Sequence, residues 1–435
     1  MELRVKPGGA LRGEVTAPGD KSIAHRALIA AALAEGESRI VGLDPLDDAL
    51  RTLGALQACG VNAAWVAPRE LRVEGRGLRG LRAPAGPLNC GLSGTTMRLL
   101  SGVLAGQPLS ATLDGLEPLR RRPMARITDP LRLMGARIEG PSAGHYAPFT
   151  IHGGELHGVD YALPVASAQV KSALLLAALN AEGETTLREP APSRDHTERL
   201  LRALGAPVQA LGGGVIRAAR AQGWPGREFA LPGDISGAAF LLTAAILVPG
   251  SQVLVRACGV NPSRRAVLDV LRAMGARLTL LDERDMGDSG EPVADLVAVP
   301  AALHGLEIGG GQIPNLIDEL PILAVAATQA QGVTTVRDAQ ELRVKETDRI
   351  AALASELGRL GARIEPTADG FVIEGPTPLR GARVDAHGDH RMAMALAVAG
   401  LAADGETVIS GAECIAKSYP GFVEALQGLG ANVNV

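Results

Sequence analysis

The stretch LRAMGARL, residues 271–278, closes an amphipathic helix pattern with a glycine and runs directly into a strand pattern. The same arrangement recurs at spacings of roughly 70–85 residues, so each repeat holds several elements and is not a short-period solenoid unit. The six copies read LGALQACGVNAA (53–64), LRLMGARI (131–138), LRALGAPV (201–208), LRAMGARL (271–278), LGRLGARI (357–364) and LQGLGANV (426–433).

A second pattern recurs in step with the first, a glycine followed by a strand pattern that contains Ser or Thr. Each repeat is therefore predicted to hold a helix, a strand, an amphipathic helix and then one or two strands, which indicates an α/β fold. The six copies are GESRI, GQPLSATL, GETTL, GSQVLV, GVTTV and GETVI, starting at Gly36, Gly106, Gly183, Gly250, Gly332 and Gly405.

The stretches APGDKS (17–22) and LPGDIS (231–236) share Pro-Gly-Asp ahead of an apolar helix pattern and predict the domain boundaries. One domain would hold residues 1–18 and 233–435, and the other residues 19–232, with three repeats in each. The first strand pattern precedes the first boundary, so it is expected to pair with the C-terminal half. We expect two similar α/β domains joined by two crossover strands, with the ligand site in the cleft between them.

Composition narrows the class of protein. Hydrophobic residues make up 46% of the 435 residues and charged residues 21%, as in ordinary globular proteins of two or three domains. A net charge of -4 gives no general affinity for polyanions or acidic membranes, and 2% aromatic residues leave few rings to stack on nucleobases. The longest apolar run, 238–248, is too short to cross a bilayer. We expect a cytoplasmic protein without nucleic-acid or membrane partners.

No metal or redox cofactor is indicated by the sequence. It has no Cys-x-x-Cys pair, no histidines at metal-ligand spacing, no Walker loop and no Gly-x-Gly-x-x-Gly fingerprint. We therefore expect chemistry without a metal or a cofactor, in a reduced protein without disulfides. The scattered cysteines are Cys59, Cys90, Cys258 and Cys414.

Polar residues open the apolar helix pattern of every repeat. Lys21 and Arg26 lie in the first turns of one such helix, where the positive end of the macrodipole disfavours cations; His390 and Arg391 repeat this arrangement. Ordinary N-caps with solvated charges are one reading, and an anionic ligand bound among the cations is the other. The six starts are GDKSIAHR (19–26), GLSGTTMR (91–98), ASAQVKS (166–172), GDIS (233–236), IDELP (317–321) and GDHRMAM (388–394).

Two further stretches concentrate charge, LEPLRRRPMAR (116–126) and ELRVKETDRIAAL (341–353). In the second, Lys345 and Arg349 are expected to repel each other as an i,i+4 pair on one helix face. The interleaved carboxylates form ion pairs on a solvated helix, or they belong to a site that needs cations for an anion and a carboxylate for proton transfer. The residues alone thus predict a small phosphorylated or carboxylated ligand.

Eight motifs together resemble the 5-enolpyruvylshikimate-3-phosphate (EPSP) synthase family from about residue 15 to 425. They are PGDKSIAHRALIAAALAEGE, SGTTMRLLSG, RRPM, SAQVKSALLLA, SRDHTERLL, IDELPILAVAA, RVKETDRI and GDHRMAMALAVAGLA. The resemblance implies two inside-out α/β barrels of three βαβαββ units each. It also implies transfer of the enolpyruvyl group of phosphoenolpyruvate to the 5-hydroxyl of shikimate 3-phosphate, in aromatic amino acid biosynthesis, by a monomer that the inhibitor glyphosate targets.

The resemblance also implies individual roles. The catalytic residues are Lys21 for proton transfer, Asp318 as the base for the hydroxyl and Glu346 as the acid and base at the methylene carbon; Glu346 must be partly desolvated to act as an acid. The residues implied to bind shikimate 3-phosphate are Lys21, Ser22, Arg26, Ser167, Ala168, Gln169, Arg194, Asp318 and Lys345. Those implied to bind phosphoenolpyruvate are Lys21, Gly94, Arg122, Gln169, Arg349, Arg391 and Lys417. No metal ligand is implied.

Two positions depart from the family pattern. Leu92 stands where the family usually has Asn in Gly-Asn-[SA]-Gly-Thr, which removes a hydrogen-bonding group from the phosphoenolpyruvate pocket. Ala168 stands where many members have serine, so a contact there falls to the backbone N–H.

Three alternatives stay open at this point. The enolpyruvyl transferase of UDP-N-acetylglucosamine shares the fold, but it usually has Lys-Asn at Lys21-Ser22 and a cysteine in the loop at 116–126. RNA 3'-terminal phosphate cyclases use related repeats, and the scarcity of aromatic residues disfavours them. A non-catalytic anion-binding protein is favoured only by Leu92.

Overall fold

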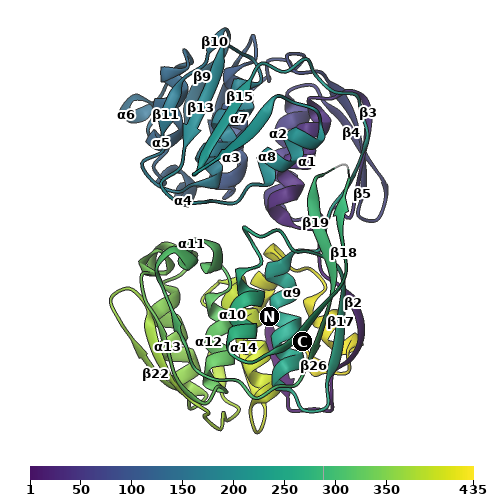
Figure 1. Ribbon diagram of the computed structural model, residues 1–435, viewed down its shortest axis with the longest axis vertical. Coiled ribbons are helices and arrows are strands. Elements are labelled where there is room, and N and C mark those ends of the chain that lie inside the picture. The colour runs from purple at the N-terminus through teal and green to yellow at the C-terminus, as the bar shows by residue number, and fades with distance from the viewer. Residues whose placement is uncertain (288) are drawn as a thin grey trace. The chain divides into compact units, whose positions relative to one another are not determined.

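The computed structural model describes residues 1–287 and 289–435 and divides the chain into two compact units. Unit 1 consists of Met1–Pro18, Pro232–Arg284 and Pro292–Val435, and unit 2 of Gly19–Leu231 and Asp285–Glu291 (Figure 1). Within the described residues, no helix is both long enough and apolar enough to span a membrane.

The strands of unit 1 form three four-stranded sheets in its described part. In order across each sheet they are β24 (Arg383–Asp385), β25 (Thr407–Ser410), β1 (Glu2–Lys6) and β26 (Asn432–Asn434); β18 (Arg277–Met286), β19 (Glu291–Val299), β17 (Gln252–Gly259) and β2 (Arg12–Thr16); and β20 (Glu307–Ile308), β21 (Gly332–Val336), β23 (Phe371–Gly375) and β22 (Arg363–Pro366).

Unit 2 repeats this arrangement. Its four-stranded sheets are β16 (Glu228–Ala230), β3 (Glu35–Val41), β5 (Glu70–Arg76) and β4 (Asn62–Ala67); β6 (Leu88–Asn89), β7 (Ser110–Asp114), β9 (Phe149–His152) and β8 (Arg137–Glu139); and β11 (Asp160–Ala162), β13 (Glu184–Arg188), β15 (Val215–Ala219) and β14 (Val208–Gly212). A short pair joins β10 (Leu156–His157) to β12 (Ala181–Glu182).

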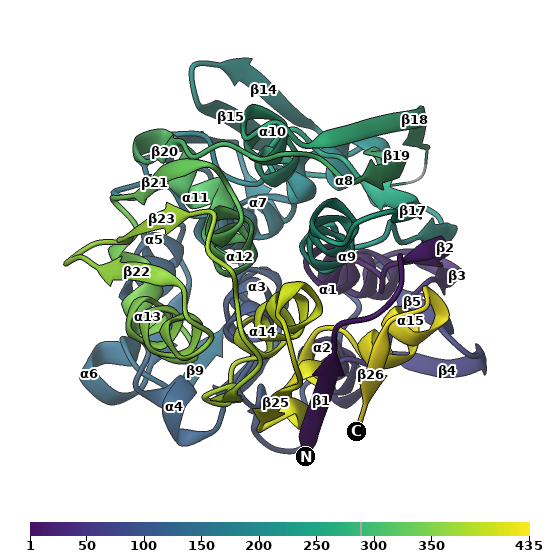
Figure 2. The same cartoon turned by 90° about the horizontal axis from the view of Figure 1, so that it is seen from below.

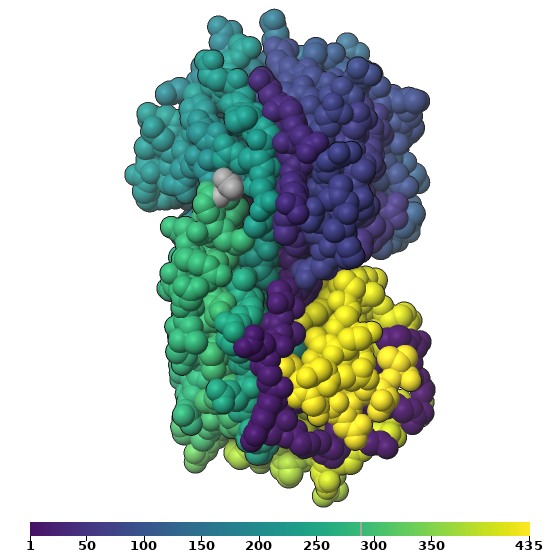
Figure 3. Space-filling view, turned by 90° about the vertical axis from the view of Figure 1, so that its right-hand side faces the viewer, coloured from purple at the N-terminus to yellow at the C-terminus, as the bar shows by residue number. Residues whose placement is uncertain are grey.

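The six four-stranded sheets share one topology. In each, the two strands at one edge are parallel and the next strand is antiparallel to its neighbour. In each unit, a sheet is completed by a strand from a distant part of the chain: β1 joins β25 in unit 1, and β16 joins β3 in unit 2. β1 pairs antiparallel with β25 and β26, so the first strand completes the last repeat (Figure 3). The predicted pairing of the N-terminal strand with the C-terminal half is therefore confirmed.

The apolar helices that open the repeats lie in the interior of each unit, with the sheets around them. In unit 1 these are α9 (Ile235–Leu247), α12 (Leu320–Thr328) and α14 (His390–Ala402), which pack on one another with strands around them (Figure 2). In unit 2 they are α1 (Lys21–Ala32), α3 (Gly94–Ala105) and α7 (Ala168–Ala178). Most side chains of these helices are apolar, as burial on every side favours. A Cβ on Gly102 would lie 2.0 Å from the carbonyl oxygen of Ala173, so α3 and α7 touch there.

Six amphipathic helices cover the repeats from outside and end as the sequence predicts. The glycine after each has positive φ, a backbone conformation that suits a residue without Cβ. These helices are α2 (Asp47–Ala58), α5 (Ala125–Leu133), α8 (His196–Ala203), α10 (Ala266–Ala273), α13 (Arg349–Arg359) and α15 (Phe422–Gly428); their glycines are Gly60, Gly135, Gly205, Gly275, Gly361 and Gly430.

One local expectation was wrong. Residues 340–344 form a 3₁₀ helix, Lys345 is extended, and α13 begins only at Arg349 behind the N-cap Asp348. Lys345 and Arg349 therefore do not share a helix face. At 317–321, α11 (Ile313–Leu316) ends before α12 begins, and the N-cap Glu319 makes no side-chain capping bond. The remaining short helices are α4 (Glu117–Arg120) and α6 (Pro141–Gly144).

One short segment in the middle of unit 1's sequence groups with unit 2, which the sequence does not indicate. Residues 285–287 and 289–291, from the end of β18 to the start of β19, group with unit 2, although most of both strands lies in unit 1. There the Glu291 carboxylate lies 2.8 Å from Nδ1 of His196, the first residue of α8, and both side chains are buried.

Candidate active site

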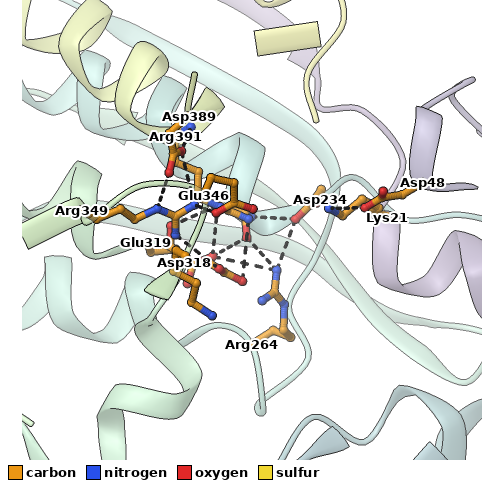
Figure 4. A network of polar contacts seen from close by, with 12 residues as sticks. Lys21, Asp48, Asp234, Arg264, Asp318, Glu319, Glu346, Arg349, Asp389 and Arg391 are labelled. Atoms are coloured by element: carbon orange, nitrogen blue, oxygen red, sulfur yellow. Dashed lines mark hydrogen bonds and ion pairs between the residues drawn. The ribbon is translucent and has the colours of Figure 1, made fainter. Parts of the chain in front are cut away.

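In unit 1 a network of charged side chains gathers at the starts of α9, α12, α13 and α14 (Figure 4). We call it the arginine–carboxylate cluster. It consists of Asp234, Arg264, Asp318, Glu319, Glu346, Arg349, Asp389 and Arg391.

Arg349, the first residue of α13, contacts three carboxylates of this cluster and is 1% exposed. Its Nε donates to Oδ2 of Asp389 at 2.7 Å and its Nη2 to Oε2 of Glu346 at 2.8 Å, while Nη1 lies 3.7 Å from Oδ1 of Asp318. Burial alone would lower the pKa of Arg349, but the carboxylates of Asp389 and Glu346 raise it above its ordinary value. The guanidinium is therefore a permanent cation.

Asp389 fixes two arginines at once. Besides binding Arg349, its Oδ1 accepts the backbone N–H groups of Arg391 and Met392 at 2.9 and 3.4 Å and so caps α14. The Arg391 side chain then reaches Asp318, donating from Nη1 to its carbonyl oxygen at 3.1 Å with Nη2 3.8 Å from its carboxylate. Sequence reasoning missed Asp389, although GDHR was among the quoted helix starts.

A deeper layer of the cluster was also missed. Glu319 is fully buried, accepts a hydrogen bond from the Ser236 hydroxyl, and lies 3.9 Å from both Arg264 and Arg391. Arg264 donates to the Ser236 hydroxyl at 2.7 Å. Because buried charges are stable only when paired and hydrogen-bonded, this layer holds the overlying groups in a fixed geometry.

Three of the predicted residues in unit 1, Lys345, Glu346 and Lys417, are partly or fully exposed to solvent. The Glu346 side chain is 39% exposed, so its neighbours in unit 1 do not supply the desolvation that an acid at this position needs. Lys345 donates to Glu341 at 2.8 Å, and the exposed Lys417 donates to the carbonyl oxygen of Gly388, just ahead of α14, at 3.1 Å.

In unit 2, Lys21 opens α1 and donates to Oδ2 of Asp48 at 3.2 Å. Burial raises the pKa of Asp48, but the charge of Lys21 and its hydrogen bond outweigh this and lower the pKa overall. Asp20 caps the helix by accepting from the N–H of Ile23 at 2.9 Å, as the sequence predicts. The carboxylate of Asp48 therefore compensates the charge of Lys21, the first cation at this helix start.

Arg26 lies deeper than its predicted substrate role suggests. Its guanidinium donates to the hydroxyls of Thr197 and Ser172 at 2.7 and 2.8 Å and to the carbonyl oxygen of Ser22 at 2.8 Å. Burial lowers the pKa of Arg26 to about 10. These contacts tie α1 to α7 and α8, whatever ligand the arginine also meets.

The start of α3 carries a group of arginines. A Cβ on Gly94 would lie 3.2 Å from Nη1 of Arg98 and 3.5 Å from Nη1 of Arg122, so both guanidinium groups face the first residue of the helix. Burial and the charges of Arg126 and Arg122 lower the pKa of Arg98 to about 10. A helix N-terminus with crowded cations suits a bound anion. Sequence reasoning missed Arg98, the last residue of GLSGTTMR.

The start of α7 lies beside this group. Gln169 accepts from Arg98 at 2.5 Å and donates to the Thr95 hydroxyl at 2.9 Å. Ser167 caps the helix, and Ala168 is its first residue, so the Ala168 N–H has no acceptor within the helix. Arg194 is half-buried in the segment ahead of α8.

The Leu92 substitution does not remove the support of the turn before α3. Asn89 accepts from the N–H of Gly91 at 2.9 Å, and the carbonyl oxygen of Cys90 accepts from the N–H of Ser93 at 2.9 Å. Leu92 itself is exposed. The turn is therefore closed without the usual asparagine.

His25 joins the helix starts of unit 2 through a chain of buried hydroxyls. Its Nδ1 lies 2.7 Å from the Thr52 hydroxyl, which lies 2.7 Å from that of Thr96. Burial, opposed by Asp48 but aided by the charge of Lys21, lowers the pKa of His25 to about 3. The imidazole is therefore neutral at physiological pH.

This pKa predicts an acid-sensitive stability. The unfolded chain binds a proton at His25 near pH 6.5 and the folded chain only near pH 3, so the stabilisation is complete above pH 6.5 and is lost as the pH falls toward 3. We expect the loss to approach about 1.4 kcal/mol per pH unit. Urea unfolding of the wild type and His25→Gln at pH 7, 6 and 5 measures it; equal pH slopes in the two proteins would refute the assignment.

In residues 1–287 and 289–435, no group of three or more His, Cys, Asp or Glu side chains is arranged to hold a metal ion.

Comparisons with known proteins agree with the geometry. The family model for EPSP synthase (3-phosphoshikimate 1-carboxyvinyltransferase) matches residues 5–426. Proteins named 3-phosphoshikimate 1-carboxyvinyltransferase from Geobacter sp. (strain M21) and Brevibacillus brevis are 51% and 49% identical, over 98% of this chain and 98% and 99% of theirs.

Solved structures match as well. A structure of EPSP synthase from Acinetobacter baumannii aligns with a TM-score of 0.92 and 42% identity, over 100% of this chain and 99% of that chain. The enolpyruvyl transferase NikO from Streptomyces tendae shares the fold, with a TM-score of 0.79 and 21% identity over 100% of this chain and 98% of that chain.

Proposed function

The chain belongs to the EPSP synthase family, and we propose that it transfers the enolpyruvyl group of phosphoenolpyruvate to the 5-hydroxyl of shikimate 3-phosphate, releasing phosphate. It is then a transferase of the shikimate pathway of aromatic amino acid biosynthesis. The observation that carries the proposal is the pair Arg349 and Arg391, held by the single carboxylate of Asp389 next to Asp318 and Glu346. The monomeric state and cytoplasmic location expected from the sequence stay predictions.

The proposed phosphoenolpyruvate contacts use the fixed cations. Arg349 and Arg391 clamp the carboxylate, because planar guanidinium groups match carboxylates in bidentate geometry. Arg122 and Lys417 hold the phosphate. The full set proposed for this substrate is Lys21, Gly94, Arg122, Gln169, Arg349, Arg391 and Lys417.

The proposed shikimate 3-phosphate contacts include the start of α7 and the segment ahead of α8. Ser167 and Ala168 open α7, where N–H groups without helical acceptors favour an anion, and Arg194 adds a positive charge. The full set proposed for this substrate is Lys21, Ser22, Arg26, Ser167, Ala168, Gln169, Arg194, Asp318 and Lys345.

The chemistry proceeds by addition and elimination. Glu346 gives a proton to the methylene carbon of phosphoenolpyruvate, which makes C2 electrophilic, while Asp318 takes the proton of the attacking 5-hydroxyl. The resulting tetrahedral adduct loses phosphate as Glu346 removes a proton from the methyl carbon, and the double bond forms again. Lys21 assists the proton transfers. General acid–base catalysis of this kind needs each carboxylate within hydrogen-bond reach of its proton.

A phosphate-release assay tests the function. Phosphate should appear from phosphoenolpyruvate only when shikimate 3-phosphate is present, with equimolar enolpyruvyl product identified by mass spectrometry. Release with UDP-N-acetylglucosamine instead would assign the related enolpyruvyl transferase activity. No release with either acceptor would leave an anion-binding protein.

Gly94 provides a prediction about inhibition. In Gly94→Ala the new methyl group crowds Arg98 and Arg122 in the proposed phosphoenolpyruvate site, and the longer inhibitor glyphosate should suffer more than the substrate. Overpacking of this size costs about 1–3 kcal/mol, or about 10–100-fold in affinity. We expect the wild type to be inhibited competitively with phosphoenolpyruvate, and Gly94→Ala to raise the inhibition constant more than KM.

Steady-state inhibition kinetics check this prediction. Gly86→Ala is the matched control, because a Cβ there meets nothing within 4 Å. Wild-type activity that persists in millimolar glyphosate would contradict the assignment of Gly94 to the pocket wall and direct attention to Leu92.

A further inference from the structure

A buried lysine lies in the middle of α7, a helix that otherwise buries small and apolar side chains. Lys171 is 1% exposed, and its Nζ lies 2.7 Å from Oε2 of Glu189 and 2.7 Å from Oε1 of Glu198. Removing such charges from water costs several kcal/mol per ion, and a protein in which apolar residues of similar volume replace the whole group of paired charges is often at least as stable. Stability therefore does not explain the lysine, and its geometry needs another explanation.

The contacts of Lys171 fall on the irregular segment that links β13 to α8. Glu189 is at its beginning, Glu198 is in the first turn of α8, and Nζ also donates to the carbonyl oxygen of Ser193 at 3.4 Å. The Ser193 hydroxyl donates to Glu189 and closes the segment on itself. Arg194 follows directly, so one ammonium group anchors the backbone that carries this arginine.

The same helix carries the other proposed groups. Ser167 and Ala168 open α7 one turn before Lys171. Lys171 therefore ties Arg194 to the helix start that faces the same ligand. Arg26 adds a second cation near Glu198, since it is buried beside this carboxylate and its guanidinium donates to Thr197 in α8.

We propose that Lys171 is a positioning residue for the binding of shikimate 3-phosphate, which it serves by fixing the segment 189–195 so that Arg194 meets the phosphate beside Ser167. This inference rests on the proposed function. Without the ammonium group the segment loses its anchor, and the buried carboxylates of Glu189 and Glu198 lose the cation that they share. Affinity for the dianionic phosphate should then fall, whereas the arginines that bind phosphoenolpyruvate in unit 1 are untouched.

The experiment compares Lys171→Met with the charge-matched double variant Lys171→Met/Glu198→Gln. Calorimetry measures Kd for shikimate 3-phosphate, steady-state kinetics measure KM for each substrate, and thermal unfolding measures Tm. We expect Lys171→Met to raise Kd and KM for shikimate 3-phosphate roughly 10- to 100-fold, since displacing a binding group by about 1 Å costs up to that much. KM for phosphoenolpyruvate at saturating acceptor should change little.

The double variant separates positioning from stability. It removes the unbalanced charge, so Tm should recover toward the wild-type value while the weakened binding persists. Arg188→Met is the matched control, since this exposed arginine on β13 pairs with the exposed Asp160 and should leave all constants unchanged. Should Lys171→Met fail to fold, the double variant carries the same comparison.

Three outcomes would overturn the inference. Wild-type affinity in folded Lys171→Met, or recovery of affinity together with Tm in the double variant, would make Lys171 purely structural while leaving the proposed function intact. A wild type that does not bind shikimate 3-phosphate would instead refute the proposed function and this inference with it.

Discussion

Replacing Glu346 with glutamine is expected to lower kcat about 10²–10⁴-fold, the usual contribution of a general acid–base group. The amide has nearly the same shape but neither gives nor takes the proton at the methylene carbon. Its carbonyl oxygen can still accept from Nη2 of Arg349, which Glu346 now binds at 2.8 Å. The local geometry, and with it the binding of shikimate 3-phosphate, should therefore persist in Glu346→Gln.

Calorimetry and steady-state rates measure this effect together. Glu374→Gln is the matched control, because Glu374 is an exposed carboxylate of unit 1 that pairs with the exposed Arg363 and has no role in the proposed chemistry. We expect unchanged kinetics in the control. A turnover near that of the wild type in Glu346→Gln would remove this residue from the mechanism.

Replacing Arg349 with methionine is expected to damage stability and substrate binding together. The guanidinium is 1% exposed and neutralises Asp389, whose carboxylate is fully buried. Removing one partner of a buried ion pair leaves an uncompensated charge and typically costs about 3–5 kcal/mol. The same change removes one of the two proposed clamps on the phosphoenolpyruvate carboxylate, so KM for this substrate should rise along with the loss of stability.

Urea unfolding and the dependence of rate on phosphoenolpyruvate concentration test this in Arg349→Met. Arg359→Met is the matched control on the same helix, since Arg359 is 61% exposed and lies 3.5 Å from its acidic partner. Because Arg359 is exposed to solvent and its buried partner Glu356 is also bound by His387 and by the N–H of Asp385, we expect the loss of this arginine to cost about 0–1 kcal/mol. Equal destabilisation in the two variants would show that Asp389 does not depend on Arg349.

The pattern of apolar helices and glycine-terminated amphipathic helices determined the architecture from the sequence alone. Burial on every side selects helices such as α9 and α14, and each amphipathic helix ends at a glycine with positive φ. Asp20, Ser93 and Ser167 cap the helices they precede in the sequence. These features depend on residues within one or two helical turns, so local sequence contains the information that they need.

Motifs also determined which functional groups collect at the helix starts. GDKS, KETDR and GDHR placed Lys21, Glu346, Arg349 and Arg391 among the candidates before any contact was known. Residue type and resemblance identify such groups because the chemistry of anion binding needs particular side chains.

The partners of these groups were decided only by the tertiary structure. Arg349 binds a carboxylate 40 positions away in Asp389, and its expected repulsion with Lys345 vanishes because the helix begins at Arg349 itself. In the sequence, Lys171 is one residue of an apolar helix pattern, and only the tertiary structure brings Glu189 and Glu198 into contact with its ammonium group. In a low-dielectric interior the energy of a charge depends on which groups the fold brings within a few ångströms, and no local pattern in the sequence specifies those distances.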